Sequence, residues 1–146
     1  MASRFLLLCL MACSSNLAYA EQTTLTNIGE AKPLFWNQVY GAGSWTLYCG
    51  EKFSLKRGLM LEAIYSIEWV AKHLGCGSIS SCRDKNQRFN HIEADLHNYY
   101  PVLLMTGRAR NGYSFGEIPG EFREYFECDF ETDGQDRLVE PRRSAR

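Results

Sequence analysis

The sequence predicts a small mixed α+β fold that is held together by disulfide bonds. Apolar residues recur at helical spacing in some segments and form short aromatic or aliphatic runs in others, which predicts both helices and strands. The 126 residues that follow a leader of 20 residues contain an even number of cysteines, four. In an exported chain this number favours two disulfides. The length suits one domain with a modest core, and neither an internal repeat nor a linker divides it.

Residues 1–20 are typical of a cleaved signal peptide. Arg4 precedes a short apolar run, and the closing letters "AYA" have the small-x-small pattern of a signal-peptidase site. The run is too short to span a bilayer, so we expect no stable membrane association. A second interpretation is a poor lipobox in which Cys13 is acylated. The first interpretation predicts a periplasmic or secreted protein that begins near Glu21.

The first part of the exported chain alternates between helical and extended patterns. A helix is predicted over residues 27–40, where apolar side chains recur every three or four positions. Residues 44–50 and 59–65 are short aromatic or aliphatic runs, and both predict strands. A second helix is predicted over residues 67–74, because an apolar stripe there ends before Gly75.

The strongest helical pattern spans residues 84–100, with apolar side chains at i, i+3 and i+4 and Pro101 as the expected end. Two pairs of polar residues share a face of this predicted helix: Glu93 with His97, and Asp95 with Asn98. Asn98 lies at its end, where an amide oxygen can bind a hard cation such as Mg²⁺. On residue types alone, the alternative is that the carboxylates are solvated and Asn98 only ends the helix.

Beyond residue 110 the sequence predicts less regular structure. Residues 111–122 are rich in turn-forming residues, and residues 123–131 form an aromatic run that predicts a late strand. Residues 137–146 are polar and basic, which predicts a mobile tail. The folded domain is therefore expected to span residues 21–136.

The four cysteines allow three disulfide connectivities. Cys76 and Cys82 flank a short serine-rich loop and can close it locally, which leaves Cys49 to pair with Cys128. The second bond would constrain a long loop of the unfolded chain, by ~4 kcal/mol in the chain-entropy model. A zinc site is disfavoured, because the chain has no CxxC pair and no histidine at a matching spacing.

Global charge does not indicate a polyanionic partner. Loss of the leader removes one arginine and no acid, which leaves 15 basic and 17 acidic residues and a net charge of −2. A site for DNA or RNA would therefore have to be a local basic surface. We expect the protein to be a monomer.

Several segments resemble the bacterial endonuclease I family. These are "RFNHIEADLHNYYPVL", "RARNGYSFGEIPGE" and "CDFE", and "AKPLFWNQVYGAGSWTLYCG" is similar to the family's amino-terminal helix and first cysteine segment. The resemblance covers residues 31–141. It implies an exported, non-specific nuclease with a ββα-metal (His-Me finger) core, which cleaves phosphodiester bonds of DNA or RNA with Mg²⁺ or another divalent cation.

In that family a Glu binds the cation, the His after it is the general base, an Asn on the following helix is the second ligand, and an Arg contacts the phosphate. Carried onto this sequence, the resemblance places the metal ligands at Glu62 and Asn98. It places the phosphate contact at Arg110, with Arg108 beside it. The general-base position is Ala63, since "EAIYSIEW" stands opposite the family's "EHVYPASW".

The missing imidazole predicts weakened catalysis, because a general base typically contributes ~10²–10⁴ in rate. We do not expect His73 or His91 to replace it, and we interpret His97 as structural. A further departure is Gly107, where family members often carry Asn. The alternative to a weak endonuclease is a relative without catalytic activity, either nucleic-acid-binding or vestigial. An unrelated binding module would leave the resemblance unexplained.

Overall fold

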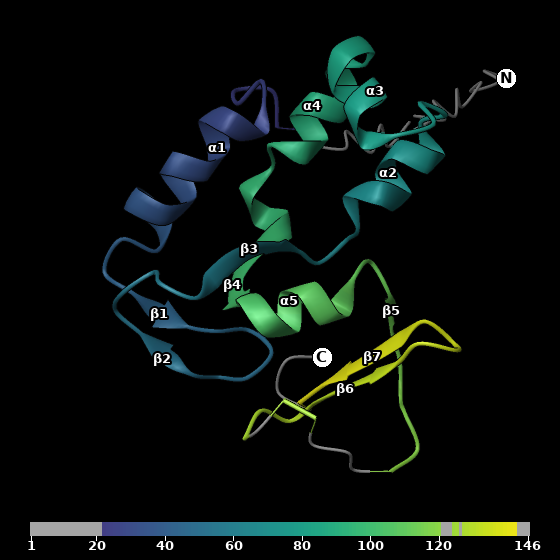
Figure 1. Ribbon diagram of the computed structural model, residues 1–146. Helices are drawn as coiled ribbons and strands as arrows, with labels where there is room; N and C mark the ends of the chain where they lie inside the picture. The colour runs from purple at the N-terminus through teal and green to yellow at the C-terminus, as the bar shows by residue number, and fades with distance from the viewer. Residues whose placement is uncertain (1–21, 121–123, 126, 143–146) are drawn as a thin grey trace, which may run out of the picture.

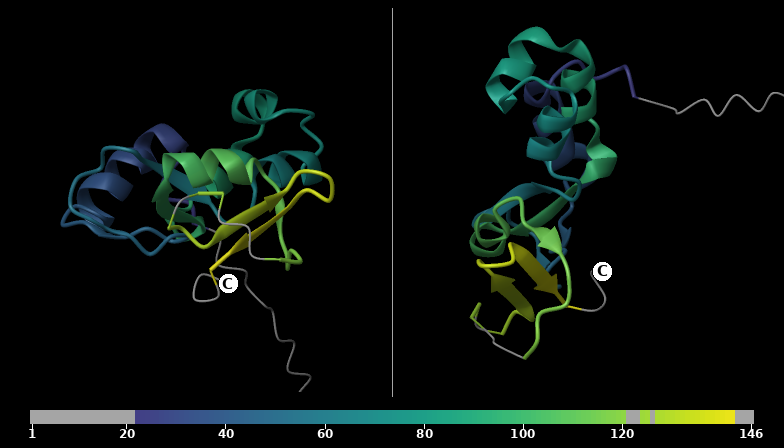
Figure 2. Two further views of the ribbon diagram at one scale, coloured as in Figure 1. Left: turned by 60° about the horizontal axis from the view of Figure 1, so that its bottom comes forward. Right: turned by 90° about the vertical axis from the view of Figure 1, so that its right-hand side faces the viewer.

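The computed structural model describes residues 22–120, 124–125 and 127–142. The predicted signal peptide, residues 1–20, and Glu21 lie outside these residues. The described chain is mixed α+β with short helices and small sheets, as the sequence predicted. Figures 1 and 2 show helices α1 to α4 at one end of the molecule, the β3–β4 pair and α5 in the middle, and the sheet of β5, β6 and β7 at the other end. Within the described ranges no helix is long and apolar enough to cross a membrane.

The amino-terminal helix forms where the sequence predicted it. Helix α1 spans Ile28–Leu34, and the side chain of Asn27 caps it by accepting a hydrogen bond from the Glu30 N–H. Pro33 lies inside the helix and has no N–H to donate to the preceding turn. The chain then continues as a π-helix over Phe35–Val39, so the predicted helix is present but widened after the proline.

The segment after α1 is less extended than predicted. Strand β1 covers only Ser44–Trp45 and pairs antiparallel with β2, Lys52–Phe53. From position 46 the chain turns, and the Leu47 N–H donates to the Pro101 carbonyl oxygen at 2.9 Å. The segment thus docks against a distant strand instead of extending its own hairpin.

Three helices lie at the upper right of the fold in Figure 1, across from α1. Helix α2 spans Ile67–His73 as predicted, α3 spans Ile79–Lys85, and α4 spans Gln87–Glu93. The chain is extended at Asn86, which ends α3, and the Asn86 side chain accepts a hydrogen bond from the Phe89 N–H at the start of α4.

The single helix predicted over residues 84–100 is therefore wrong in two respects. It is interrupted at Asn86, and it ends at Glu93 instead of at Pro101. A short 3₁₀ turn follows at Leu96–Asn98, and Tyr99–Leu103 is strand β4. Pairing with another strand overrides the helical spacing of the apolar residues in this segment.

Strand β3 spans Leu59–Ala63 and pairs antiparallel with β4, so that Glu62 lies opposite Tyr100 and Ala63 opposite Tyr99. Helix α5, Leu104–Arg110, follows β4 directly and packs against both strands. Asn111 ends α5 in the left-handed conformation, with a φ of 46°. The order strand, strand, helix brings the ends of β3 and α5 together at the centre of the molecule (Figure 1).

The last sheet has the strand order β5-β7-β6, from Ser114–Phe115, Leu138–Pro141 and Phe130–Asp133. Strand β7 runs parallel to β5 and antiparallel to β6. The prediction of a mobile tail over residues 137–146 is wrong for β7, because Val139 is fully buried and the strand is paired on both edges. Residues 143–146 lie outside the described part of the chain.

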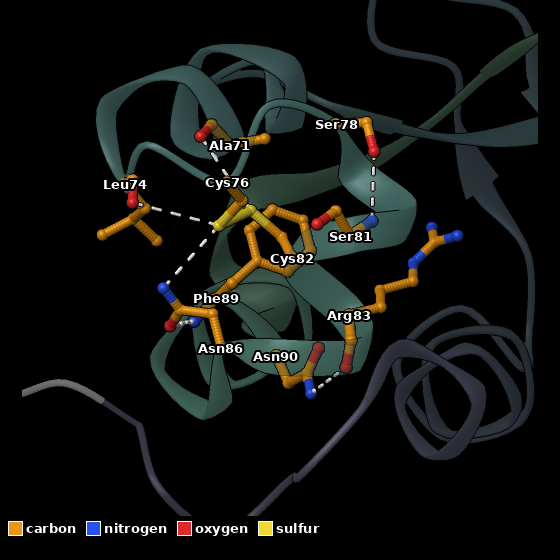
Figure 3. The surroundings of a disulfide bond; sticks show 10 residues. All are labelled: Ala71, Leu74, Cys76, Ser78, Ser81, Cys82, Arg83, Asn86, Phe89 and Asn90. Atoms are coloured by element: carbon orange, nitrogen blue, oxygen red, sulfur yellow. Dashed lines mark hydrogen bonds between the residues drawn. A yellow bond between two sulfur atoms is a disulfide. The ribbon is translucent and has the colours of Figure 1, made fainter.

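Two apolar clusters of the described core each contain one disulfide. The first is built from Tyr48, Val102, Cys128, Phe130 and Val139. The second, built from Val70, Ala71, Cys82 and Phe89, lies among the helices. The disulfides are Cys49–Cys128 and Cys76–Cys82, the two pairings that the sequence favoured. Figure 3 shows the second bond, with the Asn86 amide donating to the Cys76 sulfur at 3.7 Å.

Candidate active site

Glu62 and Ala63 lie at the end of β3, against a cavity of about 400 Å³. Residues of β3, β4 and helices α1 to α5 line this cavity. The lining residues that matter for the chemistry are Met60, Glu62, Ala63, Gly107 and Arg110. The structure therefore brings together three of the residues that the sequence placed at the site: Glu62, Ala63 and Arg110.

The charge at the centre of this site is a buried ion pair. Arg110 Nη1 donates to Glu62 Oε1 at 2.9 Å, and only 4% of the Arg110 side chain and 8% of the Glu62 side chain are exposed. The same Nη1 donates to the Ala63 carbonyl oxygen, and Nη2 donates to the Ile64 carbonyl oxygen, both at 2.7 Å. Arg110 thus closes the end of β3 with three charge-assisted hydrogen bonds.

Tyr48 completes the surroundings of Glu62 from the opposite side. Its fully buried hydroxyl donates to Glu62 Oε1 at 3.4 Å, a long and weak hydrogen bond. Burial raises the pKa of Glu62 above its usual value, and the attraction of Arg110 opposes that rise. Burial next to Glu62 also raises the pKa of Tyr48, so Tyr48 stays neutral. Sequence reasoning missed Tyr48, since nothing local to "LYCG" points to a distant carboxylate.

Asn98 is not among the residues that line the Glu62 cavity. Its Oδ1 accepts from the Tyr65 N–H at 2.8 Å, and its Nδ2 donates to the Tyr65 carbonyl oxygen at 2.9 Å. The Asn98 backbone oxygen also accepts from the Ile64 N–H at 2.9 Å. In this arrangement the amide continues the β3–β4 ladder by one residue, and its oxygen is already bound to the backbone.

Gly107 and Arg110 are the residues of α5 that line the cavity, and Gly107 lies against β3 and β4. A Cβ at this position would lie 2.5 Å from the Met60 Sδ and 2.8 Å from Val102 Cγ2, because α5 crosses β3 and β4 very closely. Gly107 is also the position at which members of the endonuclease I family often carry an asparagine. In this protein the position of that asparagine offers no side chain to the cavity.

All three histidines of the chain lie in its described part, and none lines the Glu62 cavity. His91 Nδ1 is 2.9 Å from the Leu25 carbonyl oxygen. His97 Nδ1 is 2.8 Å from Asp95 Oδ1, and 95% of the His97 side chain is exposed. His73 is the last residue of α2. The site is therefore without an imidazole next to Glu62.

Two further arginines differ sharply in their surroundings. Arg83 holds the buried carboxylate of Glu93, with Nη2 to Oε1 at 2.6 Å and Nε to Oε2 at 2.9 Å, on the wall of the cavity opposite α5. Sequence reasoning had paired Glu93 with His97 and did not find Arg83. Arg108 is exposed on the last turn of α5. It is the arginine of this helix that can reach an external ligand.

No family model matches the chain. It is 24% identical to an Endonuclease-1 of Buchnera aphidicola subsp. Acyrthosiphon pisum (strain APS), over 91% of this chain and 62% of that protein. It is 28% identical to an extracellular deoxyribonuclease of Aeromonas hydrophila, over 72% of this chain and 56% of that protein. A periplasmic deoxyribonuclease of Aeromonas hydrophila is 30% identical over 39% of this chain and 24% of its own length. Even the longest of these matches covers less than two thirds of the relative.

Proposed function

We infer from these relatives that the chain belongs to an endonuclease I-like family, and we propose that it is an exported protein that acts on DNA as a weak nuclease. Two of the relatives are named extracellular or periplasmic deoxyribonucleases, and one is named Endonuclease-1. The two disulfides are consistent with an oxidising compartment. We further propose that β3, β4 and α5 form the ββα unit that the resemblance implies.

The observation that carries this proposal is the methyl group of Ala63 beside Glu62. The cavity has the buried carboxylate of the expected site, but the adjacent side chain cannot take a proton from water. A missing general base costs ~10²–10⁴ in rate. None of the three histidines lies in the cavity to replace it, so hydrolysis proceeds without a positioned base.

The divalent cation that the resemblance implies does not fit the residues as they are arranged. Glu62 Oε1 already accepts from Arg110, and the Asn98 oxygen accepts from Tyr65. Gly107 presents no ligand, and within the described ranges no group of three or more His, Cys, Asp or Glu residues is placed to hold a metal ion. We therefore assign no reaction step to a bound metal.

The two arginines of α5 have separate roles in this proposal. Arg110 is buried and fixes the end of β3, so it does not contact the substrate. Arg108 is exposed on the same helix turn and contacts a DNA phosphate as a charge-assisted donor. The phosphate contact that the resemblance places at Arg110 is therefore assigned to Arg108.

The second candidate function is that of a DNA-binding relative without hydrolytic activity. The Glu62–Arg110 pair favours it, because a carboxylate held by a buried guanidinium is poorly placed to take part in phosphate chemistry. This candidate keeps the contact through Arg108 and the exported location. It differs from the first only in the rate of strand cleavage.

A plasmid-nicking assay with Mg²⁺ separates the two candidates. We would compare the disulfide-bonded wild type with Ala63→His, which places an imidazole next to Glu62, and with Glu62→Gln. A weak nuclease nicks slowly, gains rate in Ala63→His and loses it in Glu62→Gln. The gain should stay near or below ~10²-fold, the low end of the range for a base, because Glu62 remains paired with Arg110. A DNA-binding relative does not cut in any of the three forms.

Gel-shift binding with a chelator present gives the second readout. A DNA-binding relative retards DNA, and Arg108→Met weakens this retardation. Brisk nicking by the wild type without any gain in Ala63→His would show that the base position was wrongly assigned. An RNA substrate of equal length, run beside the DNA, tests the choice of nucleic acid.

A further inference from the structure

We propose that Arg110 is the resident cation of the Glu62 site, and that it takes the place of a divalent metal ion, which this site does not bind. The inference rests on the proposed membership of the nuclease family and deepens it, because it gives a second reason for weak hydrolysis. It concerns the contents of the site, and it can be tested without any measurement of activity.

Three oxygens converge on the guanidinium of Arg110. Glu62 Oε1 and the carbonyl oxygens of Ala63 and Ile64 lie 2.7 to 2.9 Å from its two terminal nitrogens. Carboxylate and backbone carbonyl oxygens are the ligands that hard divalent cations prefer. Here the same kind of oxygen set is bound to a cation that the chain itself supplies.

The ion pair is almost completely buried, although both residues also line the cavity. Arg110 as a residue is 3% exposed, and its Nε has no hydrogen-bond partner within the described ranges. Its guanidinium carbon lies 5.0 Å from the centre of the Phe115 ring. A metal ion that bound Glu62 Oε1 in place of Arg110 would displace a buried charge that has no other carboxylate partner in the described structure, which is strongly unfavourable.

Within the described ranges no group of three or more His, Cys, Asp or Glu residues is placed to hold a metal ion, and Glu93 at the cavity is held by Arg83. The Asn98 oxygen would have to give up the Tyr65 N–H, and Gly107 carries no ligand. A divalent ion at this site would therefore gain one carboxylate and lose the interactions of Arg110. The geometry favours the internal cation.

The test uses Mn²⁺ as the probe, with binding to the purified disulfide-bonded protein followed by calorimetry and by the loss of the free-ion paramagnetic resonance signal. Wild type is compared with Glu62→Gln. If Arg110 fills the site, the two proteins bind Mn²⁺ with the same affinity, within twofold. Wild-type affinity at least tenfold above that of Glu62→Gln would overturn the inference.

The second part of the Mn²⁺-binding test removes the internal cation, Arg110. Arg110→Met should bind Mn²⁺ at least tenfold more tightly than wild type, and the added substitution Glu62→Gln should abolish this gain. Arg57→Met is the matched control, since Arg57 is an exposed arginine just before β3 and its loss changes the net charge equally. A folded Arg110→Met protein with no gain over this control would also overturn the inference. If Arg110→Met does not fold, the comparison of wild type with Glu62→Gln still decides.

The two proposals fail in different ways. Nicking that is brisk in the wild type contradicts weak catalysis and leaves the Mn²⁺ comparison unaffected. Glu62-dependent Mn²⁺ binding together with slow nicking overturns the role of Arg110 and leaves the proposal of a weak nuclease in place. Strand cleavage and ion binding are separate measurements, so either proposal can fail while the other stands.

Discussion

Glu62 and Arg110 are the two ionised residues on which the centre of the fold depends. Both side chains are almost completely buried, and the guanidinium also binds two backbone carbonyl oxygens at the end of β3. We expect Arg110→Met to lower the free energy of unfolding at neutral pH by about 3–5 kcal/mol, because it leaves a buried carboxylate without its counterion. Urea unfolding of the disulfide-bonded protein measures this change.

Arg108→Met is the control for this loss, since it removes an exposed arginine from the same turn of α5. Its cost should stay within about 0.5 kcal/mol, as for most surface substitutions. The double variant Glu62→Gln with Arg110→Met should recover part of the stability, because no buried charge remains. Equal losses for Arg108→Met and Arg110→Met would contradict a structural role for the pair.

The pH dependence of stability should also report on Glu62. Burial raises the pKa of the folded carboxyl above the value of 4.5 that applies to the unfolded chain. Between these two pKa values the folded state binds more protons than the unfolded state, so the contribution of Glu62 to stability falls as pH rises through that window. Glu62→Gln does not titrate and lacks this fall.

Unfolding free energies measured from about pH 4 to about pH 7 test the direction of the shift. The stability of the wild type relative to Glu62→Gln should decline with rising pH. In Arg110→Met the decline should extend to higher pH, because the attraction that lowers the pKa of Glu62 is gone. A wild type that gains stability over Glu62→Gln as pH rises would mean that ion pairing outweighs burial.

At the scale of elements, the join between β3 and β4 depends on Asn98. Its amide makes two hydrogen bonds to the backbone of Tyr65, one residue beyond the last rung of backbone pairing between Ile64 and Asn98. We expect Asn98→Ala to cost about 1–2 kcal/mol in urea unfolding, since these bonds are partly exposed and each is worth ~0.5–1.5 kcal/mol net. His97→Ala, which alters an exposed neighbour, should cost much less.

Asn98→Asp sharpens this test, because aspartate keeps the acceptor for the Tyr65 N–H and loses the donor to its carbonyl oxygen. Its cost should fall between those of the two alanine variants. If Asn98→Ala costs no more than His97→Ala, the amide does not hold the strands together. A divalent cation should leave the stability of the Asn98 variants unchanged relative to wild type, as expected for an amide oxygen that serves the backbone.

The sequence predicted most elements that depend on local pattern and missed those that depend on distant partners. The helices at residues 27–40 and 67–74 and the strand at residues 59–65 could be predicted from the apolar patterns of their own segments. The first two residues of the strand Tyr99–Leu103 were predicted as the end of a helix, although the aromatic and β-branched residues of this segment are typical of a strand. Only pairing with β3, nearly forty residues earlier in the chain, decides between the two.

For the candidate site, the sequence predicted the positions of the residues but not the directions of their side chains. The resemblance located Glu62, Ala63 and Arg110 together, and the structure places all three at one cavity. It could not indicate that Arg110 turns inward to Glu62, because a side chain 48 positions away sets that direction. For Asn98, the same short motif is compatible with an amide that faces a cation and with one that bonds to the backbone of a neighbouring strand.

At the scale of the whole molecule, the described core includes two apolar clusters, and each disulfide belongs to a different one. Cys128 is buried with Tyr48 and Phe130 in the first, and Cys82 is buried with Phe89 in the second. The bonds also close loops of very different size, 79 residues for Cys49–Cys128 and 6 for Cys76–Cys82. Their contributions to stability should therefore be unequal and independent.

Replacing both cysteines of the longer loop by alanine should lower the unfolding free energy by ~4 kcal/mol, and replacing both cysteines of the shorter loop by ~2 kcal/mol, in the chain-entropy model. Because the bonds lie in separate clusters, the two losses should add within about 0.5 kcal/mol in the fourfold variant, provided that it still folds. Urea unfolding of the four proteins at one pH measures both quantities. Coupling above about 1 kcal/mol between the two bonds would instead mean that the helical end and the sheet end unfold as one cooperative core.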